Sequence, residues 1–266
     1  MSGSSFIEKD TLMKLALVQY DIVQNNPAEN ILKAQKMIDQ LPDCDIIVLP
    51  ETFNSGFIPS DTAISIDFAD ESLAWMKQAS LSKGAAICAT MFMREQGHIY
   101  NCMFFVTPDG EVHTYKKRHL FLGEEKEIIT AGASRVIVNF KGWRINLLIC
   151  YDLRFPVWSR NTGDYDLLLY SANWPEPRIE AWRILLKARA IENQTYVAGV
   201  NRVGTDNQGI HFSGESMAVD PYGRTISELE ADAEAIGIAI LDREKLVKFR
   251  SDFPALRDRD NFQIII

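Results

Sequence analysis

Short apolar runs alternate with amphipathic segments along most of this chain, and this alternation limits the folds it can adopt. Lys14–Tyr20 and Asp45–Pro50 have the length and apolar character of buried strands, and residues 26–41 between them repeat apolar side chains at helical spacing. Asn26 suits the cap of that helix, and Pro27 suits its first turn. Strands that alternate with helices in this way favour an α/β fold.

The same pattern continues to the end of the chain. Further helices are predicted around Glu71–Ser82 and over Pro177–Asn193. The further predicted strands are Ala85–Phe92, His98–Val106, Glu111–Tyr115, Arg135–Phe140, Arg144–Ile149, Asp166–Tyr170, Gln194–Asn201, Ser216–Val219 and Glu234–Ile240. The turn sequence Pro-Asp-Gly at 108–110 predicts a hairpin. Hairpins among strand–helix repeats predict mixed sheets covered by helices rather than one parallel sheet.

The whole chain is predicted to form a single domain. Its 266 residues, 47% of them hydrophobic, suffice for one large core, and no linker or low-complexity segment interrupts residues 12–266. A polar leader, residues 1–11, precedes the first strand, and a tail, residues 249–266, follows the last. The tail closes with the apolar run Phe262–Ile266, which we expect to pack against another surface.

Charge and hydropathy exclude several classes of partner. The net charge of −8 argues against nucleic acid, because proteins that bind a phosphate backbone concentrate Lys and Arg on one face. No apolar run has the length of a membrane span, and the first ten residues lack the pattern of a secretory signal. The chain is therefore expected in the cytoplasm, acting on a small molecule.

The four cysteines suggest reactivity rather than cross-linking. Cys44, Cys88, Cys102 and Cys150 form no CxxC pair, so free thiols are expected and a zinc site is not. No spacing in the chain predicts a metal or an organic cofactor. A thiol that ends an apolar strand is most often a packed core residue, but one of the four could be a nucleophile.

Three reactive side chains stand at equivalent places. Glu51 and Cys150 directly follow predicted strands, and Lys117 follows the strand that ends at Tyr115. Open α/β sheets bind ligands at the carboxyl ends of their strands, so these side chains are predicted to share a site. A carboxylate can accept the proton of a thiol, and an ammonium can stabilise a thiolate and an oxyanion. The three residue types suffice for acyl transfer.

The segments around these residues resemble those of a known family. Leu49–Phe53, Tyr115–Phe121 and Leu148–Pro156 look like the Glu, Lys and Cys blocks of the nitrilase superfamily, in the order found there. Ser171–Arg178 and Lys187–Gly204 look most like its omega-amidase branch. The resemblance extends from about Leu15 to Ile240. It implies a four-layer α-β-β-α sandwich in which two mixed sheets pack face to face.

The resemblance also implies an activity. Omega-amidases remove ammonia from the terminal carboxamide of a dicarboxylic acid monoamide, 2-oxoglutaramate or succinamate, through a thioester on the cysteine. Here Cys150 would be the nucleophile, Glu51 the proton acceptor, and Lys117 and the backbone N–H of Tyr151 the oxyanion donors. The family has a second acidic residue beside its Lys block. Glu125 matches it best, and Glu124 is the alternative.

Such a substrate needs a cation and apolar walls. Candidates for binding its far carboxylate are Arg154, Arg178 and Arg202, and an alternative role for Arg154 is to brace the Cys150 turn through Asp152. The aromatic residues Phe57, Phe121 and Trp174 are candidate walls. Family members commonly pair through helices near the nucleophile, so a homodimer or higher homo-oligomer is expected, with helix 177–193 and tail 249–266 as candidate interface segments.

Three other functions compete with this one. The first is a related hydrolase that acts on an N-carbamoyl amino acid, a nitrile or another amide. The second is a catalytically inactive nitrilase-like scaffold, against which the joint presence of Glu, Lys and Cys argues. The third is a Cys-His hydrolase, for which His119, beside the Lys block, is a better candidate than His98, His113 or His211.

Overall fold

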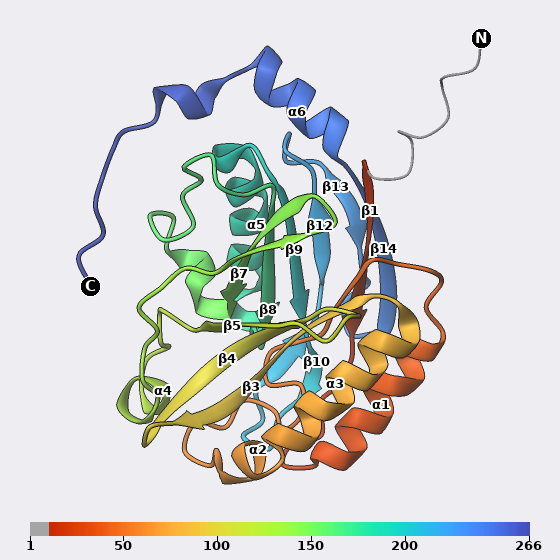
Figure 1. Ribbon diagram of the computed structural model, residues 1–266. Coiled ribbons are helices and arrows are strands. Elements are labelled where there is room, and N and C mark those ends of the chain that lie inside the picture. Colours follow the sequence, from red (N-terminus) through yellow and green to blue (C-terminus); the bar gives the residue numbers. More distant parts are fainter. Residues whose placement is uncertain (1–10) are drawn as a thin grey trace.

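Two six-stranded sheets face each other, and helices lie on their outer sides (Figure 1). The computed structural model describes residues 11–266, so the predicted polar leader lies outside the described residues except for Thr11. The first sheet has the order β14-β1-β2-β3-β4-β5, and the second has the order β13-β12-β9-β8-β7-β6. A separate two-stranded sheet pairs β10 with β11.

Both sheets are mixed in the same way. In the first, β1 and β3 flank β2 in parallel, and the other pairs are antiparallel. In the second, β7 and β9 flank β8 in parallel, again with antiparallel neighbours outside. The strands of the first sheet are β1 (Leu12–Gln19), β2 (Ile46–Val48), β3 (Ala86–Glu95), β4 (His98–Val106), β5 (Val112–Lys116) and β14 (Ala235–Asp242). Those of the second are β6 (Ile137–Phe140), β7 (Trp143–Ile149), β8 (Leu167–Ala172), β9 (Tyr196–Asn201), β12 (Met217–Val219) and β13 (Thr225–Glu228).

Alternation along the strands divides the core into layers. In β1, Leu15 and Leu17 point into the space between the sheets, whereas Ala16 and Val18 pack toward α1 and α3. Both faces of this central strand are buried, which explains its continuous apolar run. Figure 1 shows α1 and α3 side by side over the first sheet, with α5 against the second. The four layers α-β-β-α confirm the predicted fold class.

Local sequence sets the bounds of the longer helices. The helix α1 (Pro27–Asp39) begins as predicted, because the side chain of Asn26 accepts a hydrogen bond from the backbone N–H of Glu29. The helix α3 (Ala69–Lys83) ends at Gly84, whose φ of 67° favours glycine. On the second sheet, α5 (Ile179–Asn193) packs so closely that a Cβ at Gly199 of β9 would lie 2.6 Å from a ring atom of Trp182.

Most predicted elements occur within a few residues of their predicted bounds. Elements that no sequence pattern predicted are α2 (Ala63–Asp67), α4 (Glu124–Ile128), β10 (Val203–Thr205), β11 (His211–Ser213), β13 and α6 (Arg243–Asp252). Most of them are too short for a recognisable periodicity, and α6 buries a single side chain, Leu246. None of the helices in residues 11–266 is both long and apolar enough to cross a bilayer.

The end of the chain lies on the surface. After α6 comes a short 3-10 helix, Ala255–Asp258, and the last residues then run along the outside of the molecule (Figure 1). Only Ile264 of the closing apolar run packs against the core, and Ile265 is 90% exposed. Most of Phe262–Ile266 is therefore exposed in the single chain, and the expectation that this run packs against another surface stays a prediction.

Candidate active site

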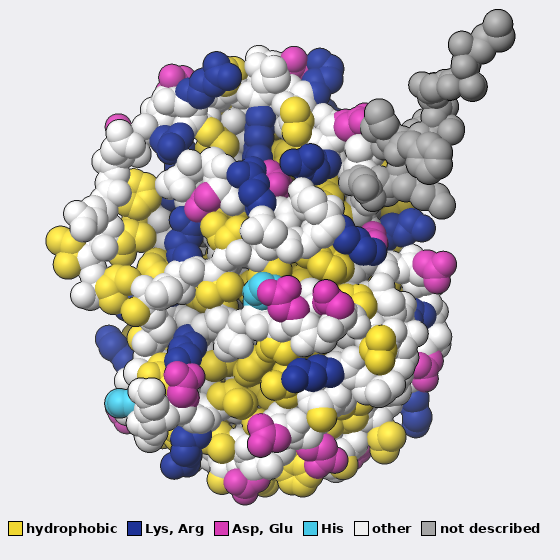
Figure 2. Space-filling view, viewed as in Figure 1, with side chains coloured by type: hydrophobic (Ala, Val, Ile, Leu, Met, Phe, Trp, Pro, Cys, Tyr) yellow, Lys and Arg dark blue, Asp and Glu magenta, His cyan; other side chains and the backbone are white. Residues whose placement is uncertain are grey.

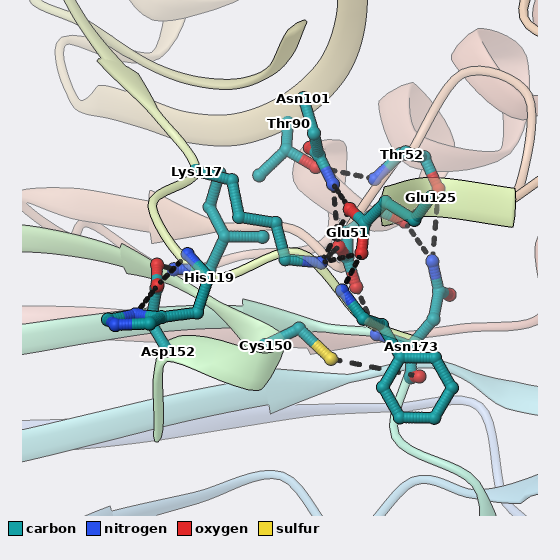
Figure 3. A network of polar contacts seen from close by, with 12 residues as sticks. Glu51, Thr52, Thr90, Asn101, Lys117, His119, Glu125, Cys150, Asp152 and Asn173 are labelled. Carbon is teal, nitrogen blue, oxygen red and sulfur yellow. Dashed lines mark hydrogen bonds and ion pairs between the residues drawn. The ribbon is translucent and has the colours of Figure 1, made fainter. Parts of the chain in front are cut away.

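Glu51 lies just beyond β2, where the two sheets meet. Its carboxylate is buried, and Oε1 accepts hydrogen bonds from Lys117 Nζ at 3.1 Å and from Asn101 Nδ2 at 2.8 Å. The other oxygen, Oε2, accepts from the backbone N–H of Asn173 at 2.9 Å. Three donors therefore hold both oxygens of this carboxylate in place (Figure 3).

Lys117 and Glu125 form a buried ion pair beside it. Lys117 Nζ lies 2.8 Å and 3.0 Å from the two oxygens of Glu125, and both side chains are buried. Burial alone would lower the pKa of Lys117, but the Glu125 and Glu51 carboxylates outweigh it and raise that pKa above its usual range. The lysine therefore stays an ammonium. Glu124, one residue earlier, is exposed and lies at the rim of the pocket.

Cys150 begins a short 3-10 helix, Cys150–Arg154, directly after β7. Its φ of 41° is unusual for a residue with a side chain and marks a strained strand-to-helix turn. The residue keeps some surface in the pocket, but protein atoms surround its thiol, and this burial raises its pKa well above the usual range. Glu51 raises that pKa further, and Lys117 opposes the increase. The resting thiol is therefore protonated at neutral pH.

Two asparagines that the sequence analysis did not single out complete the cluster. Asn101 Nδ2 contacts both Glu51 and Glu125, and Asn173 Nδ2 donates to the backbone oxygen of Glu51 at 2.9 Å. Asn173 follows β8 directly, so the rule that indicated Glu51 and Cys150 could have found it. Asn101 lies in the middle of a strand, where asparagine is rare, and this unusual position could have indicated a functional side chain.

A pocket of about 270 Å³ opens over Cys150. Glu51, Lys117 and Glu125 line it, together with Tyr151. Its walls include all five side chains that were predicted to bind substrate: Phe57, Phe121, Arg154, Trp174 and Arg178. The segment from β10 to β11 adds residues that were not predicted: Asp206, Gln208, Ile210 and Phe212. The size suits a small molecule.

Two arginines face this pocket. The guanidinium of Arg154 lies 4.8 Å from the ring centre of Trp174, and that of Arg178 lies 5.1 Å from the ring centre of Phe121. Within residues 11–266, neither guanidinium is within ion-pair distance of a carboxylate. These two guanidinium groups add local positive charge to a pocket that the carboxylates of Glu124 and Asp206 also line.

The third predicted arginine does not belong to the pocket. Arg202 is buried, with Nη2 at 2.6 Å from Asp21 Oδ1 and at 3.0 Å from the backbone oxygen of Ile22. The prediction that Arg202 could bind substrate is wrong, because its guanidinium already has internal partners. The alternative for Arg154 is wrong too, since Asp152 accepts its hydrogen bonds from other residues, among them Tyr115.

His119 lies beside Lys117 in sequence but faces away from Cys150 (Figure 3). Its Nδ1 lies 2.8 Å from Asp152 Oδ1, and its ring stacks on that of Phe155. It does not line the pocket. The geometry therefore favours Glu51 over His119 as the partner of the thiol. Within residues 11–266, no group of three or more His, Cys, Asp or Glu side chains is arranged to hold a metal ion.

Fold and site together define a carbon–nitrogen hydrolase, an α-β-β-α sandwich whose pocket holds a Glu, a Lys and a Cys side chain, and comparisons with known proteins agree. The family model described as carbon-nitrogen hydrolase matches residues 14–251. The chain belongs to this family, as its resemblance to the nitrilase superfamily predicted.

Named relatives cover nearly the whole chain. It is 42% identical to "Omega-amidase YafV" of Escherichia coli strain K12, over 95% of this chain and 98% of that protein. It is 35% identical to "2-oxoglutaramate amidase" of Bacillus subtilis, over 92% and 96%. Among solved structures, XC1258 from Xanthomonas campestris, a CN-hydrolase superfamily protein with an arsenic adduct in its active site, superposes with a TM-score of 0.92. It is 38% identical, over 95% of this chain and 99% of that one.

Proposed function

We propose that this chain is a cysteine amidase that removes ammonia from the terminal carboxamide of a small dicarboxylic acid monoamide, such as 2-oxoglutaramate or succinamate. One observation carries the proposal: Arg154 and Arg178, which pair with no carboxylate in the part of the chain that the structure describes, line the same pocket as Cys150, Glu51 and Lys117. Relatives named omega-amidase and 2-oxoglutaramate amidase support this choice of substrate.

The first half-reaction forms a thioester. Cys150 Sγ attacks the amide carbon while Glu51 accepts the thiol proton, and the negative charge that develops on the amide oxygen is stabilised by Lys117 and the backbone N–H of Tyr151. Glu51 then passes the proton to the departing nitrogen, the C–N bond breaks, and ammonia leaves. The raised pKa of the thiol supports this order, because its proton leaves only as the new bond forms.

The second half-reaction regenerates the enzyme. Glu51 removes a proton from water, the resulting hydroxide attacks the thioester carbon, and the C–S bond breaks as the proton returns to sulfur. The product is the dicarboxylic acid. Glu125, by its bidentate contact with Lys117, keeps the ammonium aimed at the reacting oxygen through both halves.

A substrate panel tests the reaction class. Succinamate and 2-oxoglutaramate should release ammonia much faster than the other compounds. Glutamine carries an ammonium beside its carboxylate, an N-carbamoyl amino acid is a urea and not a carboxamide, and a simple nitrile has no carboxylate. Preference for the carbamoyl compound or the nitrile would favour a related carbon–nitrogen hydrolase, and no turnover of any compound would favour a non-catalytic scaffold.

A second test addresses the nucleophile. Cys150→Ala should abolish ammonia release while the circular dichroism spectrum and melting temperature stay near those of the parent protein. Mass spectrometry of the parent with a slow substrate should show an acyl group on the peptide that contains Cys150. Cys102→Ala is the matched control, since that thiol is buried in β4 and should be dispensable.

We also propose that the whole chain works as one catalytic domain in the cytoplasm and pairs with a second copy. All four thiols are free, as a reducing compartment requires.

Exposed apolar side chains support the pairing. Ile184 and Ile191 on the outer face of α5 are both more than half exposed, as is Phe253 after α6. Figure 2 shows hydrophobic side chains gathered at the edge where the C-terminal tail runs. Light scattering should give a dimer mass, and Ile191→Glu should lower it to that of a monomer.

A further inference from the structure

A single buried carboxylate connects the two segments that carry Lys117 and Cys150. Asp152 lies in the short helix after β7 and has no exposed surface. Its Oδ2 accepts hydrogen bonds from the backbone N–H of Ile149 at 3.0 Å and from the hydroxyl of Tyr115 at 2.7 Å. A buried anion with this many partners is both well stabilised and firmly held.

The other oxygen contacts the same lysine segment from its far side. Oδ1 of Asp152 accepts the backbone N–H of His119 at 3.0 Å and lies 2.8 Å from His119 Nδ1 (Figure 3). Tyr115 stands two residues before Lys117, and His119 stands two residues after it. Hydrogen bonds to one carboxylate therefore hold the chain both before and after Lys117.

The cysteine side of this link is strained and needs support. Cys150 has a positive φ, and its neighbour Ile149 donates to Asp152, which holds the turn from within. Tyr115 is itself fixed by Trp158, whose Nε1 donates to its hydroxyl at 3.0 Å. None of the residues in this network lines the pocket, so the network can affect catalysis only by setting the positions of Cys150 and Lys117.

We propose that Asp152 is a positioning residue whose carboxylate fixes the nucleophile turn relative to Lys117. This inference rests on the proposed function for its catalytic meaning. An asparagine at this position offers one acceptor oxygen and one amino group, and the amino group would face N–H or O–H donors on one side. The segment around Lys117 or the turn at Cys150 would therefore lose a hydrogen bond to this side chain.

The variant Asp152→Asn should lower kcat by about 100-fold, the typical effect of a displacement near 1 Å in an active site. It should also change the titration of the thiol. If the turn loosens, Cys150 becomes hydrated and moves away from Glu51, so burial and Glu51, the largest causes that raise its pKa, both weaken. The pH midpoint of iodoacetamide alkylation at Cys150 should then fall toward the value of about 8.5 of an ordinary thiol.

Two matched controls separate positioning from general destabilisation. Asp166→Asn removes the charge of another buried carboxylate, which Arg144 and Arg250 bind. Asp166 precedes β8, at the end of that strand away from the pocket, so this variant should leave the pH midpoint of Cys150 alkylation unchanged. Tyr165→Phe removes a buried hydroxyl contact with the backbone oxygen of Ser159 and is the control for Tyr115→Phe.

The alkylation assay uses no substrate, so its result does not depend on the proposed amidase function. A failure of that function would appear separately, in the ammonia assay. A lower midpoint in Asp152→Asn supports the proposal. If that variant does not fold, Tyr115→Phe decides in the same way, because it removes one donor to Asp152 together with the acceptor of Trp158 Nε1. A wild-type midpoint in the folded variant overturns the proposal, even where the amidase rate falls.

Discussion

The backbone N–H of Asn173 donates to Oε2 of Glu51 at 2.9 Å, although the two residues lie 122 positions apart. Asn173 follows β8 in one sheet, and Glu51 follows β2 in the other. The side chain of Ser171 adds a contact between the same ends, with Oγ at 2.8 Å from the backbone oxygen of Leu49. The carboxylate is therefore fixed by the packing of the two sheets, and its acceptor oxygens are ready before substrate binds.

Glu51→Gln should reduce kcat by about a thousandfold or more, because the amide cannot accept the thiol proton. His119→Gln should cost far less, within about tenfold, since that ring contacts Asp152 and not the pocket. Steady-state ammonia release measures both. The reverse order of effects would favour a Cys-His hydrolase.

The resting thiol should react as a weak acid. Because burial and Glu51 raise the pKa of Cys150, its alkylation by iodoacetamide should still accelerate above pH 9, where an ordinary thiol has passed its midpoint of about 8.5. Burial also raises the pKa of Cys102, to about 12, so its peptide should stay unmodified. Peptide mass spectrometry across pH gives both results. A rate that levels off below pH 8 would mean a preformed thiolate.

The two pocket arginines should determine KM for anionic amides. Arg154→Gln and Arg178→Gln should each raise KM for succinamate by about tenfold or more, the usual worth of a charge-assisted contact, and leave turnover of propionamide unchanged. Arg94→Gln, at an exposed position near the end of β3, is the matched control. Equal losses on both amides would show that the arginines support the structure and do not bind the carboxylate.

Periodicity predicted the layers well because the central strands are long and buried on both faces. Lys14–Tyr20 and Arg144–Ile149 could be recognised from single runs of sequence, and they proved to be inner strands of the two sheets. The hairpin β10–β11 could not, since its three-residue strands, Val-Gly-Thr and His-Phe-Ser, lack the apolar run that marks β2, which is equally short. Its contribution to the pocket depends on a tertiary position that no local pattern encodes.

The site could be predicted where chemistry and strand ends coincide. Glu51, Lys117 and Cys150 were identified in this way, and the structure brings them together. The contacts that hold them could not be predicted, because Asn101 and Asp152 act through partners distant in sequence. Arg202 shows the opposite case: its place in a family-like segment makes it a candidate for binding substrate, but its partner, Asp21, lies 181 positions away.

Adjacent glutamates offer the sharpest test of the fourth site residue. Glu125 Oε2 accepts the backbone N–H of Phe121 at 2.6 Å in addition to its two contacts with Lys117, whereas Glu124 is exposed at the rim of the pocket. Glu125→Gln leaves the volume unchanged but removes the charge that holds the ammonium, so kcat should fall by about 100-fold. Burial raises the pKa of Glu125, and Lys117 opposes that rise.

Glu124→Gln is the matched control, and its kcat should stay within about threefold of the parent, because exposed charges at a pocket rim have small effects. A double variant, Lys117→Met with Glu125→Gln, should be no slower than Lys117→Met alone, since Glu125 acts through the lysine. Additive losses would mean that Glu125 contacts substrate directly. Equal losses for Glu124→Gln and Glu125→Gln would contradict the assignment, because only one of these carboxylates reaches the ammonium.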